Sequence, residues 1–224
     1  MDDAAGEFFK LFPAGKACLF TSQNLSSKGI SAYSHEFDKS CITADGNILP
    51  VKSITGVVTL IPAIFSWELI QIKKEDREYV AAEMTAFMIY FLSCLKCPKL
   101  NPPSPSCLSG FNWRHEHWIK KAFELKIPVQ PIEINSREEI KNNYPNGKLI
   151  TITIIGDQYC GTDDQLLIAY AFRLAKHTGI ELLQVNFIEY SNDEIYFLSA
   201  SQFPDIDDNS VRKAIVDYFT TNNV

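Results

Sequence analysis

Short apolar runs separated by polar breaks fill the first sixty residues, and this pattern is typical of β-strands. Apolar and polar positions alternate in three segments, residues 40–44, 47–51 and 56–61. The pattern predicts three strands. Asp45 and Gly46 separate the first two and tolerate the positive φ of a tight turn, so we expect a hairpin there. Residues 16–21 also resemble a strand, and the polar residues 22–37 after them are expected to form a loop.

The next segment changes from strand to helix periodicity. Between Lys74 and Leu95 the apolar side chains recur at spacings of three and four, at Val80, Met84, Phe87, Met88, Phe91, Leu92 and Leu95. This spacing predicts a long amphipathic helix. A proline-rich stretch follows, so residues 99–100 are at most a short strand. A second helix is expected over residues 113–126 and a strand over residues 127–134.

The second half alternates hairpins with helices. Hairpins are predicted from residues 149–157 with 158–161, and from residues 180–190 with 194–200. Between them, residues 163–178 form a helix that Gly179 ends, because glycine readily takes the left-handed conformation of a C′ position. The second hairpin turns at Asn192 and Asp193, and a last helix begins with Asn209 or Ser210 as its N-cap. The fold class is therefore α/β, with an α+β second half.

Composition and charge exclude several classes of protein. The chain has 224 residues, 46% of them apolar and 21% charged, which is ordinary for a globular protein. Its net charge of -6 and its lack of a basic stripe argue against a nucleic-acid partner. The longest apolar run, residues 87–95, is far shorter than the roughly 20 residues of a spanning helix, so we expect no membrane segment. The acidic N-terminus does not resemble a signal peptide, and we expect the six cysteines to be thiols in the cytoplasm.

The order of elements resembles that of ATP-grasp carboxylate-amine ligases, which activate a carboxylate as an acyl phosphate. Residues 100–131 run from a strand ending in Asn101 and Pro102, through a loop and a helix, to the segment KIPVQP. This order is similar to the end of the pre-ATP-grasp domain of the family. Residues 180–205 are similar to the metal-bearing strands of its C-terminal subdomain. The resemblance implies a Rossmann-like pre-ATP-grasp domain at residues 1–131, a connector at 132–147, and a reduced ATP-grasp subdomain with an antiparallel sheet at 148–224.

Two departures from the family bear on catalysis. Ser199 stands where the resemblance implies a glutamate, Ser201 where it implies an asparagine, and Asn186 where an aspartate often stands. A serine hydroxyl is a weaker Mg²⁺ ligand than a carboxylate, so these three positions are expected to be a degenerate metal site. Only residues 132–148 occupy the interval in which the family has a lid, which is too short for several strands and helices.

These departures favour a non-catalytic ATP-grasp-like scaffold that binds a ligand or a partner, either as a homo-oligomer or beside a complete ligase. No cofactor is expected. The alternative is an ATP-dependent carboxylate-amine ligase that a second chain completes, and only this alternative requires ATP and Mg²⁺.

Two further candidate sites come from the residues themselves. Asn101, Ser104, Arg114 and His117 could form a ligand pocket, because open α/β sheets bind ligands at the carboxyl ends of their strands. An amphipathic helix start with an inward-packed tryptophan explains the same helix residues without a ligand. Cys94, Cys97 and Cys107 could hold zinc as a thiol-based binding module, although the spacing matches compact zinc ribbons poorly. Buried or half-buried thiols are the simpler interpretation of these cysteines.

Overall fold

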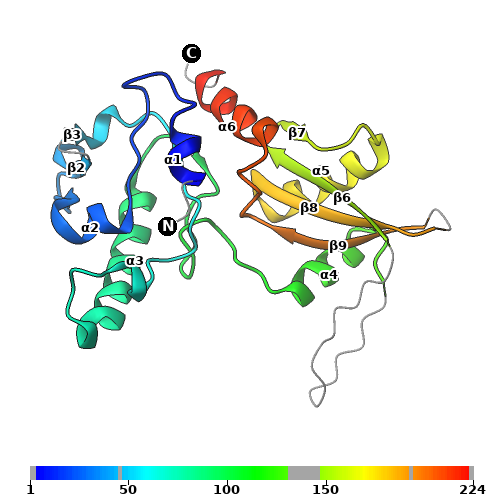
Figure 1. Cartoon of the computed structure of the whole chain (residues 1–224), viewed down its shortest axis with the longest axis horizontal. Helices are drawn as coiled ribbons and strands as arrows, with labels where there is room; N and C mark the ends of the chain where they lie inside the picture. The colour runs from blue at the N-terminus through cyan, green and yellow to red at the C-terminus, as the bar shows by residue number, and fades with distance from the viewer. Residues whose placement is uncertain (1–3, 45–46, 131–146, 192–193, 222–224) are drawn as a thin grey trace. The chain divides into compact units, whose positions relative to one another are not determined.

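The computed structural model describes residues 4–44, 47–130, 147–191 and 194–221. The chain divides into two compact units, one formed by Met1–Asn112 with Asp205–Val224 and the other by Trp113–Pro204. Figure 1 labels most of the helices and strands of the two units, which are treated separately below. The domain boundaries predicted at residues 131 and 148 come from the order of elements in the family resemblance. The two compact units are defined instead by contacts within the folded chain. They do not test the predicted domains, which stay a prediction.

The first unit combines small sheets with helices. Its helices are α1 (Ala4–Phe9), α2 (Ser22–Lys28), α3 (Arg77–Cys94) and α6 (Asn209–Thr221), and four short 3₁₀ segments lie at Phe37–Lys39, Val51–Ser53, Ser66–Glu68 and Lys74–Asp76. One antiparallel sheet contains β1 (Ile30–Ser31), β2 (Cys41–Ala44) and β3 (Asn47–Pro50), and a parallel pair joins β4 (Val57–Val58) to β5 (Lys99–Leu100). The hairpin of β2 and β3 is confirmed by its register, although Asp45 and Gly46 lie outside the described residues.

Helix α3 supplies much of the core of this unit. Its buried face carries Ala81, Phe91 and Leu92, and these pack with Leu69 and Leu108 from the flanking loops. The prediction of a long helix over residues 74–95 is therefore confirmed, with its first turn in 3₁₀ form. Its predicted amphipathic character was wrong, because large side chains such as Tyr79 and Tyr90 are exposed on the same helix. The C-terminal helix α6 joins this unit, because Gly56 beside β4 leaves room for the ring of Phe219.

Three local predictions for this unit were wrong. Residues 16–21 form no strand, and residues 22–28 form α2 instead of a loop. The reason is a capping box, in which the Asn24 amide donates to the Thr21 hydroxyl and the Thr21 amide donates to the Asn24 side chain. The predicted strand 56–61 is only two residues long, because the carbonyls of Thr59 and Ile61 accept hydrogen bonds from Ser109 Oγ instead of pairing with a strand.

The N-cap of α6 was also misplaced by one or two residues. Asp208 precedes the helix, and its Oδ1 accepts hydrogen bonds from the Ser210 amide at 2.7 Å and from the Ser210 hydroxyl at 2.7 Å. These bonds lower the pKa of the Asp208 carboxyl below its ordinary value. Asp is a strong N-cap because its carboxylate satisfies amides that have no partner within the helix.

The second unit is built on a four-stranded antiparallel sheet in the order β7-β6-β8-β9. Its strands are β6 (Lys148–Ile155), β7 (Gln158–Cys160), β8 (Leu182–Glu189) and β9 (Ile195–Ser201), and its helices are α4 (His115–Glu124) and α5 (Gln165–Thr178). The strand pairing of the two predicted hairpins and both helices are confirmed, whereas Asn192 and Asp193, the predicted turn of the second hairpin, lie outside the described residues. Gly179 ends α5 with φ of 66°, as predicted. Of the predicted strand 127–134, Val129 forms a single bridge to Phe197, and residues 131–134 lie outside the described part.

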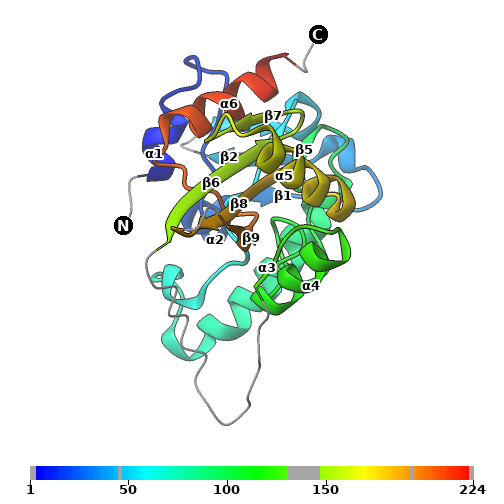
Figure 2. The ribbon, with the colours of Figure 1, turned by 90° about the vertical axis from the view of Figure 1, so that its right-hand side faces the viewer.

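Helices α4 and α5 pack on the same face of this sheet and bury its core. Trp118 and Ala122 of α4 and Ala171 and Leu174 of α5 belong to one cluster with the inward residues of the strands. Figure 2 shows α5 running along the sheet. The opposite face of β6, β8 and β9 carries half-buried polar side chains as well as buried apolar ones such as Ile155 and Leu182.

Candidate functional site

The strands of the second unit sort their side chains between two faces. Ile152, Val185 and Phe197 belong to the core beneath the helices. Their neighbours along the strands point to the opposite face, because side chains alternate along a strand. A bulge between Asn186 and Phe187 leaves Leu198 as an extra residue, so that Ser199 still pairs with Asn186. Ser201 pairs with Gln184 on the same face.

Four of the polar side chains on this face form what we call the neutral network, Thr151, Gln184, Asn186 and Ser199. Asn186 is its centre. Its Oδ1 accepts a hydrogen bond from Thr151 Oγ1 at 2.9 Å and one from Gln184 Nε2 at 3.4 Å. Its Nδ2 donates to Ser199 Oγ at 3.0 Å. The structure thus brings the predicted positions Asn186 and Ser199 into direct contact.

The third predicted position, Ser201, is used differently. Its hydroxyl oxygen accepts a hydrogen bond from the Phe203 amide at 3.1 Å, which stabilises the turn after β9. The hydroxyl therefore serves the backbone that follows the strand. Sequence reasoning placed Ser201 correctly beside the other two positions along the strand, but its contact within the turn has no signal in a periodicity pattern.

The neutral network does not fit Mg²⁺, the metal that the fold family implies. Mg²⁺ prefers several hard oxygen ligands, usually with carboxylates among them, and the network offers only amides and hydroxyls that already bond to one another. Across the described residues, no three His, Cys, Asp or Glu side chains lie close enough to hold a metal ion. What the arrangement can do chemically is donate and accept hydrogen bonds at a neutral surface.

The predicted ligand pocket is divided between the two compact units. Asn101 and Ser104 lie in the first unit and are buried. Asn101 has φ of 61°, and Ser104 Oγ donates to the Gly110 carbonyl at 2.8 Å, so both residues shape the proline-rich loop after β5. The hydrogen bond of a buried serine to its own loop explains its burial by a structural role, and no ligand is needed.

The other two residues of that predicted pocket lie at the start of α4 in the second unit. Arg114 is the N-cap residue, and its carbonyl accepts a hydrogen bond from the His117 amide at 3.0 Å. Both side chains are exposed. Trp118 packs inward and lies 4.9 Å from the Trp113 ring, measured between centroids. This packing is the one expected for an amphipathic helix start, and the four-residue pocket remains a prediction.

The cysteines are all thiols, and no disulfide joins any of the six. Cys107 is buried, whereas Cys94 and Cys97 are half-buried. Burial raises the pKa of the Cys97 thiol, which disfavours the thiolate that a zinc ion would need. The zinc interpretation finds no cluster of three ligands in the part of the chain that the structure describes.

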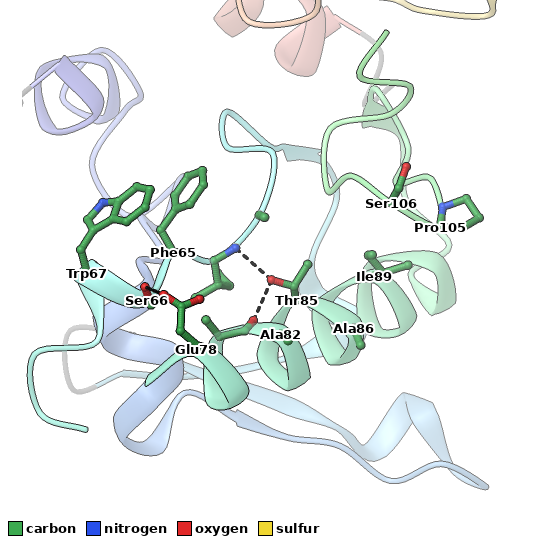
Figure 3. Close-up of a pocket in the computed structure, with 13 residues that line it drawn as sticks. Phe65, Ser66, Trp67, Glu78, Ala82, Thr85, Ala86, Ile89, Pro105 and Ser106 are labelled. Carbon is green, nitrogen blue, oxygen red and sulfur yellow. Dashed lines mark hydrogen bonds between the residues drawn. The ribbon is translucent and has the colours of Figure 1, made fainter. Parts of the chain in front are cut away.

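Sequence reasoning missed a groove in the first unit. It has a volume of about 470 Å³ and runs along α3, with Trp67 and Glu78 at one end and Ser106 at the other (Figure 3). The available signal was Trp67, a large aromatic in a polar-flanked turn that no strand or helix pattern explains. An exposed tryptophan is a common anchor in binding surfaces, and Trp67 is 68% exposed.

Comparison with known proteins places the fold. No protein-family model matches the sequence, and no curated protein matches it either. Among solved structures, the macrocyclase MdnC from Microcystis aeruginosa MRC, bound with the precursor peptide MdnA, is similar with a TM-score of 0.72 and 13% identity. The match covers 99% of this chain and 97% of MdnC.

Two further structures agree. A RiPP-associated ATP-grasp ligase from Chryseobacterium gregarium, in complex with ADP and a leader and core peptide, matches with a TM-score of 0.68 and 11% identity over 99% of this chain and 93% of that one. The ATP-grasp ligase PsnB, complexed with a minimal precursor, matches at 0.65 and 10% over 99% and 94%. The chain therefore has an ATP-grasp-like α/β fold, and both the resemblance and the fold class drawn from the sequence are confirmed.

Proposed function

We propose that the chain is an ATP-grasp-like binding protein that holds a peptide or protein partner and does not itself form an acyl phosphate. The observation that carries this proposal is the contact between Asn186 and Ser199, at the strand positions where the resemblance implies metal ligands. The side chains there bond to each other across β8 and β9. They stabilise the sheet and leave no carboxylate at these two positions for Mg²⁺.

The chemistry of the family explains why this substitution matters. Phosphoryl transfer depends on Mg²⁺ to neutralise charge on the phosphates as the acyl phosphate forms. Ser199 stands in place of the implied glutamate and so removes one negative charge from the implied metal site. Asn186, in place of an aspartate, removes a second negative charge. The short interval at 132–148 does not support the proposal, because the structural matches span nearly the whole of both chains. Most of that interval also lies outside the described residues. The proposal therefore rests on Asn186 and Ser199.

A peptide is the partner class that the comparisons favour. The structures of MdnC, of the Chryseobacterium gregarium ligase and of PsnB each contain a precursor or leader peptide. A scaffold that loses metal ligands can retain a surface that binds such a chain. We propose that the protein acts in this way as a homo-oligomer or beside a complete ligase, and that it does so in the cytoplasm, where its six thiols would stay reduced.

A second candidate function is an ATP-dependent ligase whose metal ligands come from another chain. It is favoured by the three solved neighbours, two of which are named as ATP-grasp ligases and one as a macrocyclase. The two candidates differ in one measurable property: the ligase must bind ATP with Mg²⁺ and turn it over when its partner is present.

Restoring the implied ligands tests the proposed origin of the neutral network. The double variant Ser199→Glu with Ser201→Asn would be titrated with Mg²⁺-ADP by isothermal calorimetry and compared with the wild type. We expect at least a tenfold gain in affinity, because a carboxylate at position 199 would offer Mg²⁺ the hard, charged oxygen ligand that the resemblance implies there. The matched control makes the same two changes on α2, Ser26→Glu with Ser27→Asn, and should gain nothing. An unchanged affinity in the β9 variant would contradict the view that this strand end is a degenerate metal site.

A further inference from the structure

The groove along α3 has a nonpolar floor made of small side chains. Ala82 and Ala86 lie one helical turn apart, and Ile89 continues the same face toward Pro105 and Ser106 (Figure 3). Small residues leave a furrow between the helix and the loop that carries Phe65. The volume of about 470 Å³ lies in the range of sites that take small ligands or a few side chains.

The one polar side chain in the middle of the groove is already satisfied. Thr85 Oγ1 accepts a hydrogen bond from the Ile64 amide at 3.0 Å and donates to the Ala81 carbonyl at 2.8 Å. Its hydroxyl thus fastens the loop to the helix and is not available to a ligand. The middle of the groove therefore offers only apolar contact.

One end of the groove differs because it combines aromatic rings with a negative charge. The Phe65 and Trp67 rings stack with centroids 4.3 Å apart and an interplanar angle of 11°. Beside them, Glu78 accepts a hydrogen bond from Ser66 Oγ at 2.6 Å through Oε1. Glu78 is the ionisable residue among those lining the groove, so the lining carries a negative charge.

No neighbouring cation neutralises that carboxylate within the described part of the chain. Arg77 is adjacent in sequence, but its guanidinium donates to the carbonyls of Ile70 and Ile72, each at 2.9 Å. The ion pairs of the described residues do not involve Glu78. An aromatic stack beside an unneutralised carboxylate is the combination that binds a cationic side chain, through cation–π contact and charge-assisted hydrogen bonds.

We propose that this groove binds a short extended peptide segment that carries one arginine or lysine flanked by apolar residues. The basic side chain lies against the exposed Trp67 ring and pairs with Glu78, and the apolar neighbours lie over Ala82, Ala86 and Ile89. From Glu78 to Ile89 the helix rises about 16 Å at roughly 1.5 Å per residue. An extended peptide covers that length with about five residues at roughly 3.3 Å each.

The groove is separate from the neutral network, although the inference rests on the proposed function of peptide binding. All of its lining residues belong to the first compact unit, whereas the neutral network belongs to the second. Loss of peptide binding at the groove would leave the nucleotide result expected from the neutral network unchanged, so the two failures can be distinguished.

The test is a fluorescence-polarisation titration of the full chain with labelled five-residue peptides. The probe is N-acetylated Arg-Leu-Ala-Leu-Ala, which places the basic residue at one end, and the matched probes carry Gln or Glu in place of Arg. We expect the Arg peptide to bind at least tenfold more tightly than the Glu peptide, with the Gln peptide between them. Raising the salt concentration from 50 to about 500 mM should narrow the difference, since the carboxylate is at an open surface.

Two variants locate the site. Glu78→Gln should weaken the Arg peptide about five- to tenfold and leave the Gln peptide unchanged, whereas Ala86→Phe should weaken both by filling the furrow. Glu83→Gln on the exposed side of α3 is the matched control and should change neither. The proposal is overturned if the three peptides bind equally, if none binds below millimolar concentration, or if Glu83→Gln acts like Glu78→Gln. It is also overturned if sedimentation shows that a second copy of the chain fills the groove and excludes the peptide.

Discussion

The hydrogen bond between Asn186 and Ser199 can be tested by a double-mutant cycle. Ser199→Ala removes one hydrogen bond of 3.0 Å, which costs about 1 kcal/mol for a partly buried neutral pair. Asn186→Ala removes that bond and the 2.9 Å bond from Thr151, together with a weak contact from Gln184, so its cost is about 2 kcal/mol. In the double variant the shared bond is lost only once.

The double variant should therefore cost about 2 kcal/mol and not about 3, which gives a coupling energy of about 1 kcal/mol. The free energy of unfolding would be measured by urea denaturation followed by circular dichroism. The exposed residue Ser191 gives the control, because it lies in the turn beyond Glu189, the end of β8, and Glu189 is itself roughly 10 Å of strand from Asn186. Asn186→Ala and Ser191→Ala should be additive. A coupling energy near zero for Asn186 and Ser199 would refute the neutral network as described.

Three other predictions concern the scaffold. Trp118→Ala should lower the free energy of unfolding by about 3–5 kcal/mol because Trp118 is 2% exposed, and Phe123→Ala on the same helix, 65% exposed, should change it by less than about 0.5 kcal/mol in urea titrations. Gly179→Ala should lower the free energy of unfolding by about 1 kcal/mol, because a Cβ there meets no other atom and only the left-handed backbone is strained. Gly161→Ala should lower it several-fold more, because its Cβ would collide with a backbone carbonyl of β6. Thermal melts of the two variants compare these losses. Asp208→Ala should cost about 1 kcal/mol at neutral pH. The folded-state pKa of Asp208 is lowered, so its stabilisation is full above the ordinary carboxyl pKa and disappears as the pH falls through the lower folded value. The wild-type and variant melting curves should therefore differ at pH 7 and converge as the solution is acidified below the ordinary carboxyl range.

The elements that periodicity predicts well are those with long apolar repeats. Helix α5 with Gly179 and the hairpins of the second unit were found from spacing, because burial of one face imposes the period on the sequence. Spacing also located helix α3, although apolar side chains are not confined to one of its faces. The family resemblance rested on the order of the elements and on the segments at residues 100–131 and 180–205. The solved structures that bear it out are only 10–13% identical to this chain.

The elements that were missed depend on single hydrogen bonds. Helix α2 begins because Thr21 and Asn24 cap each other, and no apolar repeat marks it. The strand predicted at 56–61 is shortened because Ser109, about fifty residues away, bonds to its carbonyls. Such contacts join residues that are distant in the chain, and a pattern read along the chain cannot contain them.

The candidate site could be predicted only in part, because some of its contacts join residues that are distant in the chain. The positions of Asn186 and Ser199 on neighbouring strands followed from the strand order, and their contact is in the register. The bulge that keeps them opposite each other was not predictable, since it arises from one extra residue, Leu198. The groove at Trp67 was missed because its walls come from a turn, a helix and a proline-rich loop, which only the folded chain brings together.

The most direct test of the central claim is calorimetry of the purified wild-type chain with ATP and Mg²⁺, combined with an assay for released phosphate. The neutral network predicts no binding at micromolar nucleotide and no release of phosphate above the background of buffer alone. Clear micromolar binding of ATP-Mg²⁺ together with turnover would contradict the account and establish the chain as a working ligase.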